Sequence, residues 1–477
     1  MSGAALPIAL QALGLASSSD HIGSAWSQST AALKTRLELA LAAGRPLWTR
    51  PWIGPTAWTS GETVKVGDVR KTAANQLYIC AGVGGVCGAT EPTQLDASAV
   101  WDGTANLSAL WIHIGAAAWD SADDPAKPTI TVGDNTTPSG LTQVFPASNT
   151  SVFTLRGCSG EVFNTSRLRL RVFNDGVAQR DVPASVAFMS DAPKIGFRVK
   201  DLSAGIRVFV DGRPLTLSPH IAQDATAYKW FTCDWASRKP RLYEVMYGKD
   251  TATYLLEIAV STADQVWAYK PPVNLRGAFI GDSYLGGSGY GPFLLGNTLS
   301  NHFGRLCGID DMWNFGTGGT GLLNPGSGPY STYRGRLAQA LALKPDALFV
   351  YGSTNDNGYT QTAVTTEALA FLDAIRDATD APVFWFGPAS LGATSTADAG
   401  IAAAVAQRPN RNIIYKSMMA ATPPWLTGAH NNAAYTWTSN TSQYIGGDGV
   451  HPVDKGTMYL AQRMLASYAN DLLPLVG

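Results

Sequence analysis

The 477-residue sequence is poor in charge: charged residues make up 15% of the chain, and 35 basic residues are balanced by 36 acidic ones. It has no basic stripe of the kind that binds nucleic acid, and no acidic or basic tail. It also has no apolar run of the length needed to span a bilayer. We therefore expect a folded protein with no nucleic-acid partner and no membrane span.

Cysteine is scarce as well, and its five positions do not have the spacing of metal ligands. Cys80 and Cys87 are close enough for a disulfide that closes a loop, but the sequence does not decide whether it forms. The odd total leaves at least one free thiol, and the redox compartment stays open. No cluster of Asp, Glu and His suggests a metal either, so we expect no cofactor.

The first 20 residues are apolar but lack the basic residue that precedes the apolar part of a secretory signal, and they contain a proline. Further along, Leu33, Leu37 and Leu41 recur at helical spacing, and Gly44 is a stop signal. We predict that residues 1–45 form a helical segment that attaches the chain to another surface.

Glycine, proline and tryptophan are abundant, at 49, 27 and 14 residues, which indicates many turns and much β structure. The length predicts two to four domains. Residues 46–125 contain short β-like runs separated by turn residues and predict a small β module. Its function is open between carbohydrate binding and a structural spacer.

Residues 126–272 have the pattern of antiparallel β structure. Residues 167–171 alternate arginine with leucine, the period of a half-buried strand. Asp211-Gly212 separates two strand-like runs and predicts a hairpin. About eight short strands without helices predict a β-sandwich of the jelly-roll-like kind.

Residues 273–477 change to apolar strands that alternate with helices, which predicts an α/β domain with a parallel sheet. The expected strands lie near 276–280, 311–315, 346–351, 382–386 and 412–415. The expected helices lie near 292–303, 333–343, 363–377, 396–407 and 454–472. In such sheets the functional site lies beyond the carboxyl ends of the strands.

Four groups of small or polar residues fall at that edge. Gly281-Asp282-Ser283 follows the first strand, a glycine-rich run at 316–321 follows the second, and Asn355-Asp356 follows the third. Asp448-Gly449-Val450-His451 comes directly before the last helix. Each group alone could be an ordinary turn, but the four together in this order predict a catalytic site.

These groups resemble the SGNH hydrolases, also called GDSL-type esterases, over residues 274–477. The resemblance implies a three-layer α/β fold, with Ser283 as nucleophile, His451 as base and Asp448 as its orienting acid. Gly319 and Asn355, with the Ser283 N–H, match the oxyanion hole. Tyr284 stands where the family pattern usually has leucine.

The chemistry needs these residue types. A serine hydroxyl is a weak nucleophile until a neighbouring base accepts its proton. A carboxylate on the other ring nitrogen fixes the tautomer of the histidine. Hydrogen-bond donors must stabilise the oxyanion, and losing one commonly costs about 2.7–4 kcal/mol of transition-state stabilisation.

Two further resemblances suggest a substrate. A β-sandwich ahead of an SGNH domain is similar to two-domain carbohydrate O-acetylesterases. The small β module resembles modules of phage tail and virion proteins, and the residues that carry this resemblance are Val66–Arg70, Leu77–Cys80, Pro92-Thr93, Trp101–Thr104 and Trp111. Together they imply an O-deacetylase of capsule or O-antigen polysaccharide on a virion, with tail proteins as partners and a homo-oligomer as the assembly.

Two alternatives stay open. The first is a secreted lipid or polyester esterase, for which Trp385, Phe386, Trp425 and Leu426 would form the acyl pocket. The second is a non-catalytic glycan- or receptor-binding protein with this fold. In either enzyme reading, we expect Asp356, Trp425 and His430 to contact substrate.

Overall fold

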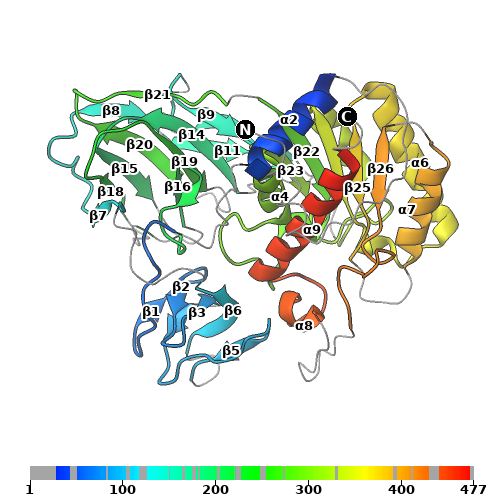
Figure 1. Ribbon diagram of the computed structural model, residues 1–477, viewed down its shortest axis with the longest axis horizontal. Coiled ribbons are helices and arrows are strands. Elements are labelled where there is room, and N and C mark those ends of the chain that lie inside the picture. The colour runs from blue at the N-terminus through cyan, green and yellow to red at the C-terminus, as the bar shows by residue number, and fades with distance from the viewer. Residues whose placement is uncertain are drawn as a thin grey trace.

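The computed structural model describes most of the chain (Figure 1). The described residues are 28–42, 51–81, 84–103, 108–117, 126–149, 151–163, 167–174, 179–180, 183–200, 205–219, 221, 227–247, 254–271, 274–327, 331–389, 395–409, 412–428 and 440–472. The domain boundaries expected near 45, 125 and 272 lie outside these residues or at their edge, and they stay predictions. Within the described residues, no helix is both long enough and apolar enough to cross a membrane.

The described part of the N-terminal segment is helix α2 (Gln28–Ala42), which docks on the C-terminal part of the same chain (Figure 1). Leu33 and Leu37 are buried in the core that this part of the chain forms. Arg36 donates to the carbonyl of Gly308 at 2.5 Å and to Asp310 at 2.8 Å. The helix therefore has a partner surface within this chain, and attachment of the N-terminal segment to another molecule stays a prediction.

The small β module has two sheets. A four-stranded antiparallel sheet has the order β2-β3-β6-β5, and β1 pairs with β4. Their bounds are β1 Thr63–Val64, β2 Val69–Lys71, β3 Gln76–Cys80, β4 Gly85–Val86, β5 Ala99–Trp101 and β6 Leu110–Ala116. Asp102 accepts the indole N–H groups of Trp58 at 3.3 Å and Trp111 at 2.7 Å, so these tryptophans organise the interior of the module. Cys80 and Cys87 are buried free thiols.

The next part of the chain forms two larger antiparallel sheets, with the orders β17-β16-β19-β14-β21 (β9 also pairs with β14) and β7-β18-β15-β20-β8. Phe197 of the second sheet lies 6.3 Å from Phe188 and 5.8 Å from Tyr243 of the first, measured between ring centroids. The two sheets therefore pack through aromatic rings. The predicted hairpin at Asp211-Gly212 is confirmed, since both residues have positive φ in the turn from β16 to β17. The jelly-roll-like arrangement stays a prediction.

The bounds of these strands are β7 Thr129–Val132, β8 Gln143–Pro146, β9 Thr154–Arg156, β10 Ser159–Phe163, β11 Arg167–Arg171, β12 Phe173–Asn174, β13 Gln179–Arg180, β14 Ala184–Ser190, β15 Lys194–Lys200, β16 Arg207–Val210, β17 Arg213–Pro214, β18 Lys229–Asp234, β19 Arg241–Tyr247, β20 Tyr254–Val260 and β21 Val266–Ala268.

The C-terminal part is an α/β domain whose parallel sheet has the order β23-β22-β24-β25-β26. The strands are β22 Arg276–Gly281, β23 Asp311–Gly316, β24 Ala347–Tyr351, β25 Val383–Phe386 and β26 Ile413–Lys416. Alternate side chains of β22 pack into different cores: Phe279 joins the core under α2, α4 and α9, whereas Ala278 and Ile280 join the one under α5, α6 and α7. Helices thus cover both faces of the sheet, as the pattern predicts.

The helices are α3 Ser283–Gly286, α4 Leu299–Cys307, α5 Tyr333–Ala342, α6 Gln361–Ala378, α7 Thr396–Ala406, α8 Thr441–Tyr444 and α9 Asp454–Leu472, with a 3₁₀ turn η1 at Thr354–Asp356. The helix expected near 292–303 begins instead at Leu299. Gly291 and Gly296 have positive φ, and the side chain of Thr298 caps the helix by accepting the Asn301 N–H. The residues between α3 and α4 therefore form a loop, and its first residues, Gly287 and Ser288, lie beside Ser283.

A buried ionic contact joins the β-rich region to the α/β domain. Glu244 of β19 accepts hydrogen bonds from Arg156 of β9 at 2.9 Å and from Arg305 of α4. Burial alone would raise the pKa of Glu244, but the two guanidinium groups outweigh it and the pKa is lowered. Because the carboxylate stays ionised between two cations, this contact fixes how the two parts sit against each other.

Candidate active site

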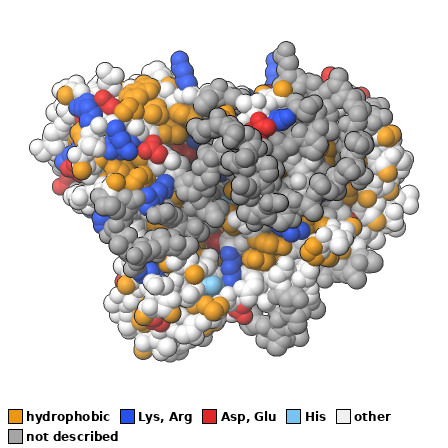
Figure 2. All heavy atoms as spheres, in the orientation of Figure 1, with side chains coloured by type: hydrophobic (Ala, Val, Ile, Leu, Met, Phe, Trp, Pro, Cys, Tyr) orange, Lys and Arg blue, Asp and Glu red, His pale blue; other side chains and the backbone are white. Residues whose placement is uncertain are grey.

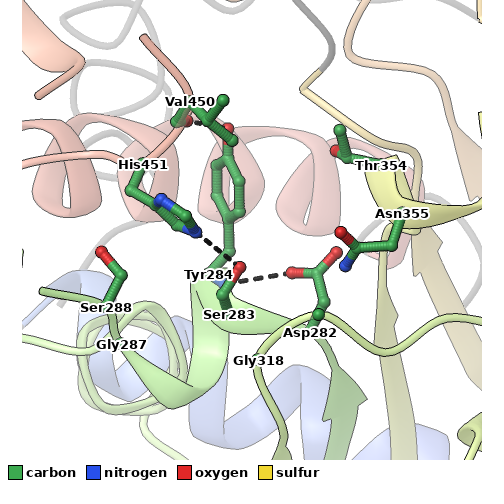
Figure 3. A pocket seen from close by; sticks show the side chains of 11 residues that line it. Asp282, Ser283, Tyr284, Gly287, Ser288, Gly318, Thr354, Asn355, Val450 and His451 are labelled. Carbon is green, nitrogen blue, oxygen red and sulfur yellow. Dashed lines mark hydrogen bonds between the residues drawn. The ribbon is translucent and has the colours of Figure 1, made fainter. Parts of the chain in front are cut away.

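Ser283 is the first residue of the short helix α3, directly beyond the end of β22 (Figure 3). The turn is tight because β22 and β23 each end in a glycine, Gly281 and Gly316. A Cβ at Gly281 would lie 2.6 Å from a methyl carbon of Leu285, and one at Gly316 would lie 2.4 Å from the Leu285 Cβ. Asp282 caps α3, and its Oδ1 accepts the Tyr284 N–H at 3.0 Å. The backbone therefore places the Ser283 hydroxyl at the edge of the sheet.

His451 and Asp448 complete a hydrogen-bonded chain with Ser283. The Nε2 atom of His451 lies 2.7 Å from Ser283 Oγ (Figure 3). The Nδ1 atom of His451 contacts Asp448 Oδ2. The other carboxylate oxygen, Asp448 Oδ1, accepts the N–H groups of His451 at 3.0 Å and Val450 at 3.1 Å. With Nδ1–H donating to the carboxylate, Nε2 is free to accept the serine proton.

The electrostatics suit this arrangement. Burial opposes ionisation of Asp448, but hydrogen bonds from the His451 ring and from the His451 and Val450 N–H groups outweigh it, so the pKa of Asp448 is lowered. Asp282 behaves in the opposite way: burial raises its pKa to about 6, against the opposing effects of the Tyr284 N–H and of His451. The pKa values of these two carboxyl groups thus shift in opposite directions because their environments differ.

The loop that carries His451 is held by its own backbone and by Tyr284. The Gly446 N–H donates to the His451 carbonyl at 2.7 Å, and Gly449 turns the chain with φ of 71°. The Tyr284 hydroxyl donates to the Val450 carbonyl at 2.5 Å. The residue that departs from the family pattern is therefore in contact with the histidine loop.

The oxyanion-hole candidates lie across the serine from this loop. Gly319 and Asn355 line the same cavity as Ser283 and His451, with a volume of about 320 Å³. Gly319 has φ of 74°, which favours glycine, and the Asn355 Nδ2 donates to the Thr320 carbonyl at 2.9 Å. A Cβ at Gly318 would lie 3.7 Å from the Ser283 Cβ, so the glycine run brings its backbone close to the nucleophile.

The three expected substrate contacts are a different case. Asp356 is buried, and its carboxylate accepts the N–H groups of Leu322, Leu323 and Asn324 at 2.7–3.1 Å. It therefore shapes the loop after β23 instead of facing the cavity. Trp425 is 3% exposed and packs against Phe386 in the core, away from the cavity lining, which corrects that expectation. His430 lies outside the described residues.

The structure adds cavity residues that were not expected: Asp282, Tyr284, Gly287, Ser288, Gly318, Thr354 and Val450. Gly287 and Ser288 form one side of the cavity, and Thr354 and Asn355 form the other (Figure 3). Asp282, Gly318 and Val450 belong to the four groups, and the other four residues are their near neighbours in the sequence. Among the described residues, no group of three or more His, Cys, Asp or Glu side chains could hold a metal.

With this geometry in place, the comparisons with known proteins become informative. Residues 279–457 match the GDSL-like Lipase/Acylhydrolase family. This GDSL-like domain contains every member of the constellation, from Ser283 to His451. No curated protein matches the sequence.

Solved structures similar to this chain include the following three. One is a salicylyl-acyltransferase from a tetracycline biosynthetic pathway, with 15% identity, a TM-score of 0.51, and coverage of 70% of this chain and 97% of that one. Another is a family two carbohydrate esterase from Clostridium thermocellum in complex with cellohexaose, with 16% identity, a TM-score of 0.48, and coverage of 67% and 99%. The third is an acetyl xylan esterase from the rumen bacterium Butyrivibrio proteoclasticus, with 14% identity, a TM-score of 0.43, and coverage of 69% and 98%. At these identities the likeness concerns the fold alone.

Proposed function

We propose that the chain is a serine ester hydrolase whose nucleophile is Ser283. The observation that carries this proposal is the hydrogen-bonded chain from Asp448 through His451 to Ser283 Oγ, which opens into a cavity that Gly319 and Asn355 also line. Nucleophile, base, orienting acid and oxyanion donors thus meet at one point, which is the arrangement that acyl transfer requires.

In the first half of the reaction, Ser283 Oγ attacks the ester carbonyl carbon and its proton passes to His451 Nε2. The tetrahedral oxyanion is stabilised by the N–H groups of Ser283 and Gly319 and by the side-chain amide of Asn355. Its collapse breaks the bond to the alcohol oxygen, which takes the proton from His451. In the second half, His451 deprotonates a water molecule that attacks the carbonyl carbon of the acyl-serine. The bond to Ser283 Oγ then breaks, the serine oxygen takes the proton back from His451, and the carboxylic acid leaves.

For the substrate, we propose an O-acetylated cell-surface polysaccharide, such as a capsule or O-antigen. The cavity wall supports a small acyl group: it consists largely of glycine backbone and short polar side chains, and Val450 is its one aliphatic side chain among the described residues. The combination of a β-rich region with a GDSL-like domain is in keeping with this substrate class. Release of acetate from an acetylated bacterial polysaccharide, with the Ser283→Ala variant as control, tests it; no release by the wild type would contradict it.

A lipid or polyester esterase is less well supported. The residues expected to form its acyl pocket do not line the cavity: Trp385, Phe386 and Trp425 are buried in the hydrophobic cores, and Leu426 packs against one of them. Hydrolysis that becomes faster from p-nitrophenyl acetate to the octanoate would favour this alternative. A non-catalytic glycan-binding protein is disfavoured because the complete triad is present, and glycan binding without turnover by the full-length chain would favour it.

The biological setting is also a proposal. The resemblance of the small β module to phage modules supports a virion protein that contacts tail proteins and forms a homo-oligomer. Mass spectrometry of purified phage particles would detect the chain there. Recovery only from the particle-free culture medium would favour a secreted enzyme instead.

A further inference from the structure

The small β module packs directly on the segment that carries the catalytic histidine (Figure 1). Val453, two residues after His451, is fully buried. It belongs to the same hydrophobic cluster as Val69, Ile79 and Ile112 of the module. The module core is therefore continuous with the chain that leaves the active site.

Polar contacts fix the same junction. The ammonium of Lys455, in the first turn of α9, donates to the Leu95 carbonyl at 3.0 Å and to Gln443 Oε1 at 3.4 Å, and it lies 3.1 Å from His113 Nδ1. The Ala97 N–H of the module donates to the Ser442 carbonyl at 2.8 Å. Figure 2 shows histidine atoms beside Lys or Arg atoms where the module meets the rest of the molecule.

The ionisation states make this an attractive contact near neutral pH. Burial, with a further effect of Lys455, lowers the pKa of His113 to about 4, so its ring is neutral. The ring is held at both nitrogens: Nδ1 lies 2.9 Å from the Leu95 carbonyl, to which Lys455 also donates, and Nε2 lies 3.0 Å from Gln76 Oε1. Burial also lowers the pKa of Lys455, to about 8, so the ammonium is charged in neutral solution.

The module also contacts a second loop, which lies beside the histidine loop. Leu294 is buried in the module cluster and Phe293 packs against it. The backbone N–H groups of Phe293 and Leu294 each donate to the carboxylate of Asp454 at 2.9 Å, and Asp454 directly precedes Lys455. These residues belong to the loop that begins with Gly287 and Ser288 in the cavity wall. The module thus contacts both the histidine loop and the loop that continues from the cavity residues Gly287 and Ser288.

We propose that the small β module positions the histidine loop for catalysis, and that Lys455 is the positioning residue that transmits this constraint from Leu95 and His113. The inference rests on the proposed function, since it concerns the efficiency of Ser283 and His451. Displacements of about 1 Å at a catalytic group can lower the rate on the order of 10²-fold. Loss of a contact that prevents such displacements should therefore lower kcat.

The test compares three lysine variants of the full-length chain. Lys455→Met keeps the length of the side chain but removes the ammonium, and we expect kcat for p-nitrophenyl acetate to fall about tenfold with KM within twofold. Lys455→Arg keeps a charged donor and is expected to retain most of the wild-type kcat. Lys239→Met, at an exposed position in the β-rich region, is the matched control and should behave as wild type.

A double-mutant cycle tests whether the effect of Lys455 on kcat depends on its contact with the module. His113→Leu removes the imidazole ring that contacts both Leu95 and Lys455, and we expect it to lower kcat as well. If both residues act through the one contact, the double variant loses no more than the larger single loss. Multiplied losses would show that Lys455 acts independently of the module and would overturn the proposal. So would a Lys455→Met variant with wild-type kcat.

A fluorophosphonate probe separates this proposal from the function on which it rests. The serine oxygen bonds to phosphorus as fluoride leaves, and the rate depends on activation of Ser283 by His451. A wild type that neither hydrolyses esters nor reacts with the probe contradicts the proposed function. A wild type that reacts at the same rate as Lys455→Met, with both folded by circular dichroism, contradicts the positioning role alone.

Discussion

The Nε2 atom of His451 lies 2.7 Å from the Ser283 hydroxyl oxygen, although 168 positions separate the two residues in the chain. The contact exists because β22 and the segment before α9 both end at the same edge of the parallel sheet. Three kinds of support hold it: the carboxylate of Asp448, the hydroxyl of Tyr284, and the glycine turns that bring the backbone close. The first two each give a prediction that can be measured.

Asp448→Asn should lower kcat by roughly 10⁴-fold with little change in KM, because an amide can stabilise the wrong histidine tautomer and does not compensate the imidazolium. Steady-state kinetics on p-nitrophenyl acetate measure this. The same substitution at the exposed Asp377 is the control and should leave kcat unchanged. An Asp448→Asn variant within tenfold of wild type would mean that the carboxylate does not orient His451.

Asn355→Ala should lower kcat by roughly 10²–10³-fold, since it removes one donor to the oxyanion. The effect should be on kcat more than on KM, because the donor is needed most when charge develops on the carbonyl oxygen. Equal binding of a boronic acid transition-state analogue by the variant and the wild type would count against this role.

Tyr284→Phe removes a single hydroxyl and leaves the Val450 carbonyl without this donor. We expect the free energy of unfolding to fall by about 1 kcal/mol and kcat to fall severalfold, because the carbonyl belongs to the residue before His451. Urea unfolding and steady-state kinetics on the same preparation measure both effects. Unchanged kcat alongside the lower stability would limit Tyr284 to a structural role.

Asp282 should make stability depend on pH. Burial raises its pKa from 3.8 to about 6 in the folded chain, so between these values the folded state binds more protons than the unfolded state. The contribution of Asp282 to the free energy of unfolding therefore falls as pH rises through this window. Since a shift of one pKa unit corresponds to about 1.36 kcal/mol, the total loss is about 3 kcal/mol. We expect Asp282→Asn to gain stability relative to wild type from pH 4 to pH 6.

Urea unfolding of both proteins at several pH values in that range measures this difference and cancels the titration of all other groups. A difference between the two proteins that does not vary with pH would show that Asp282 titrates normally.

The sequence alone predicts the sheet of the GDSL-like domain and the members of the site well, because the signals are local. A buried parallel strand is a continuous apolar run, as in Phe279-Ile280, and a turn at its end requires glycine and small polar residues. Two boundaries differ for equally local reasons. Asp282 caps a short helix at Ser283 that was not expected, and α4 begins after Thr298 rather than near 292.

The remaining features could not be predicted because they depend on contacts between distant segments. Nothing near Trp425 indicates that it packs on Phe386 in the core, and nothing near Asp356 indicates three N–H partners 32–34 positions away. Likewise, Lys455 meets Leu95 across 360 positions, and no pattern in either segment indicates that contact.

The measurement with the most direct bearing on function is hydrolysis of p-nitrophenyl acetate by wild type and Ser283→Ala. We predict turnover by the wild type and a loss of roughly 10³-fold or more in the variant, with superimposable circular dichroism spectra. A variant that hydrolyses the ester at the wild-type rate would contradict the assignment of Ser283 as the nucleophile.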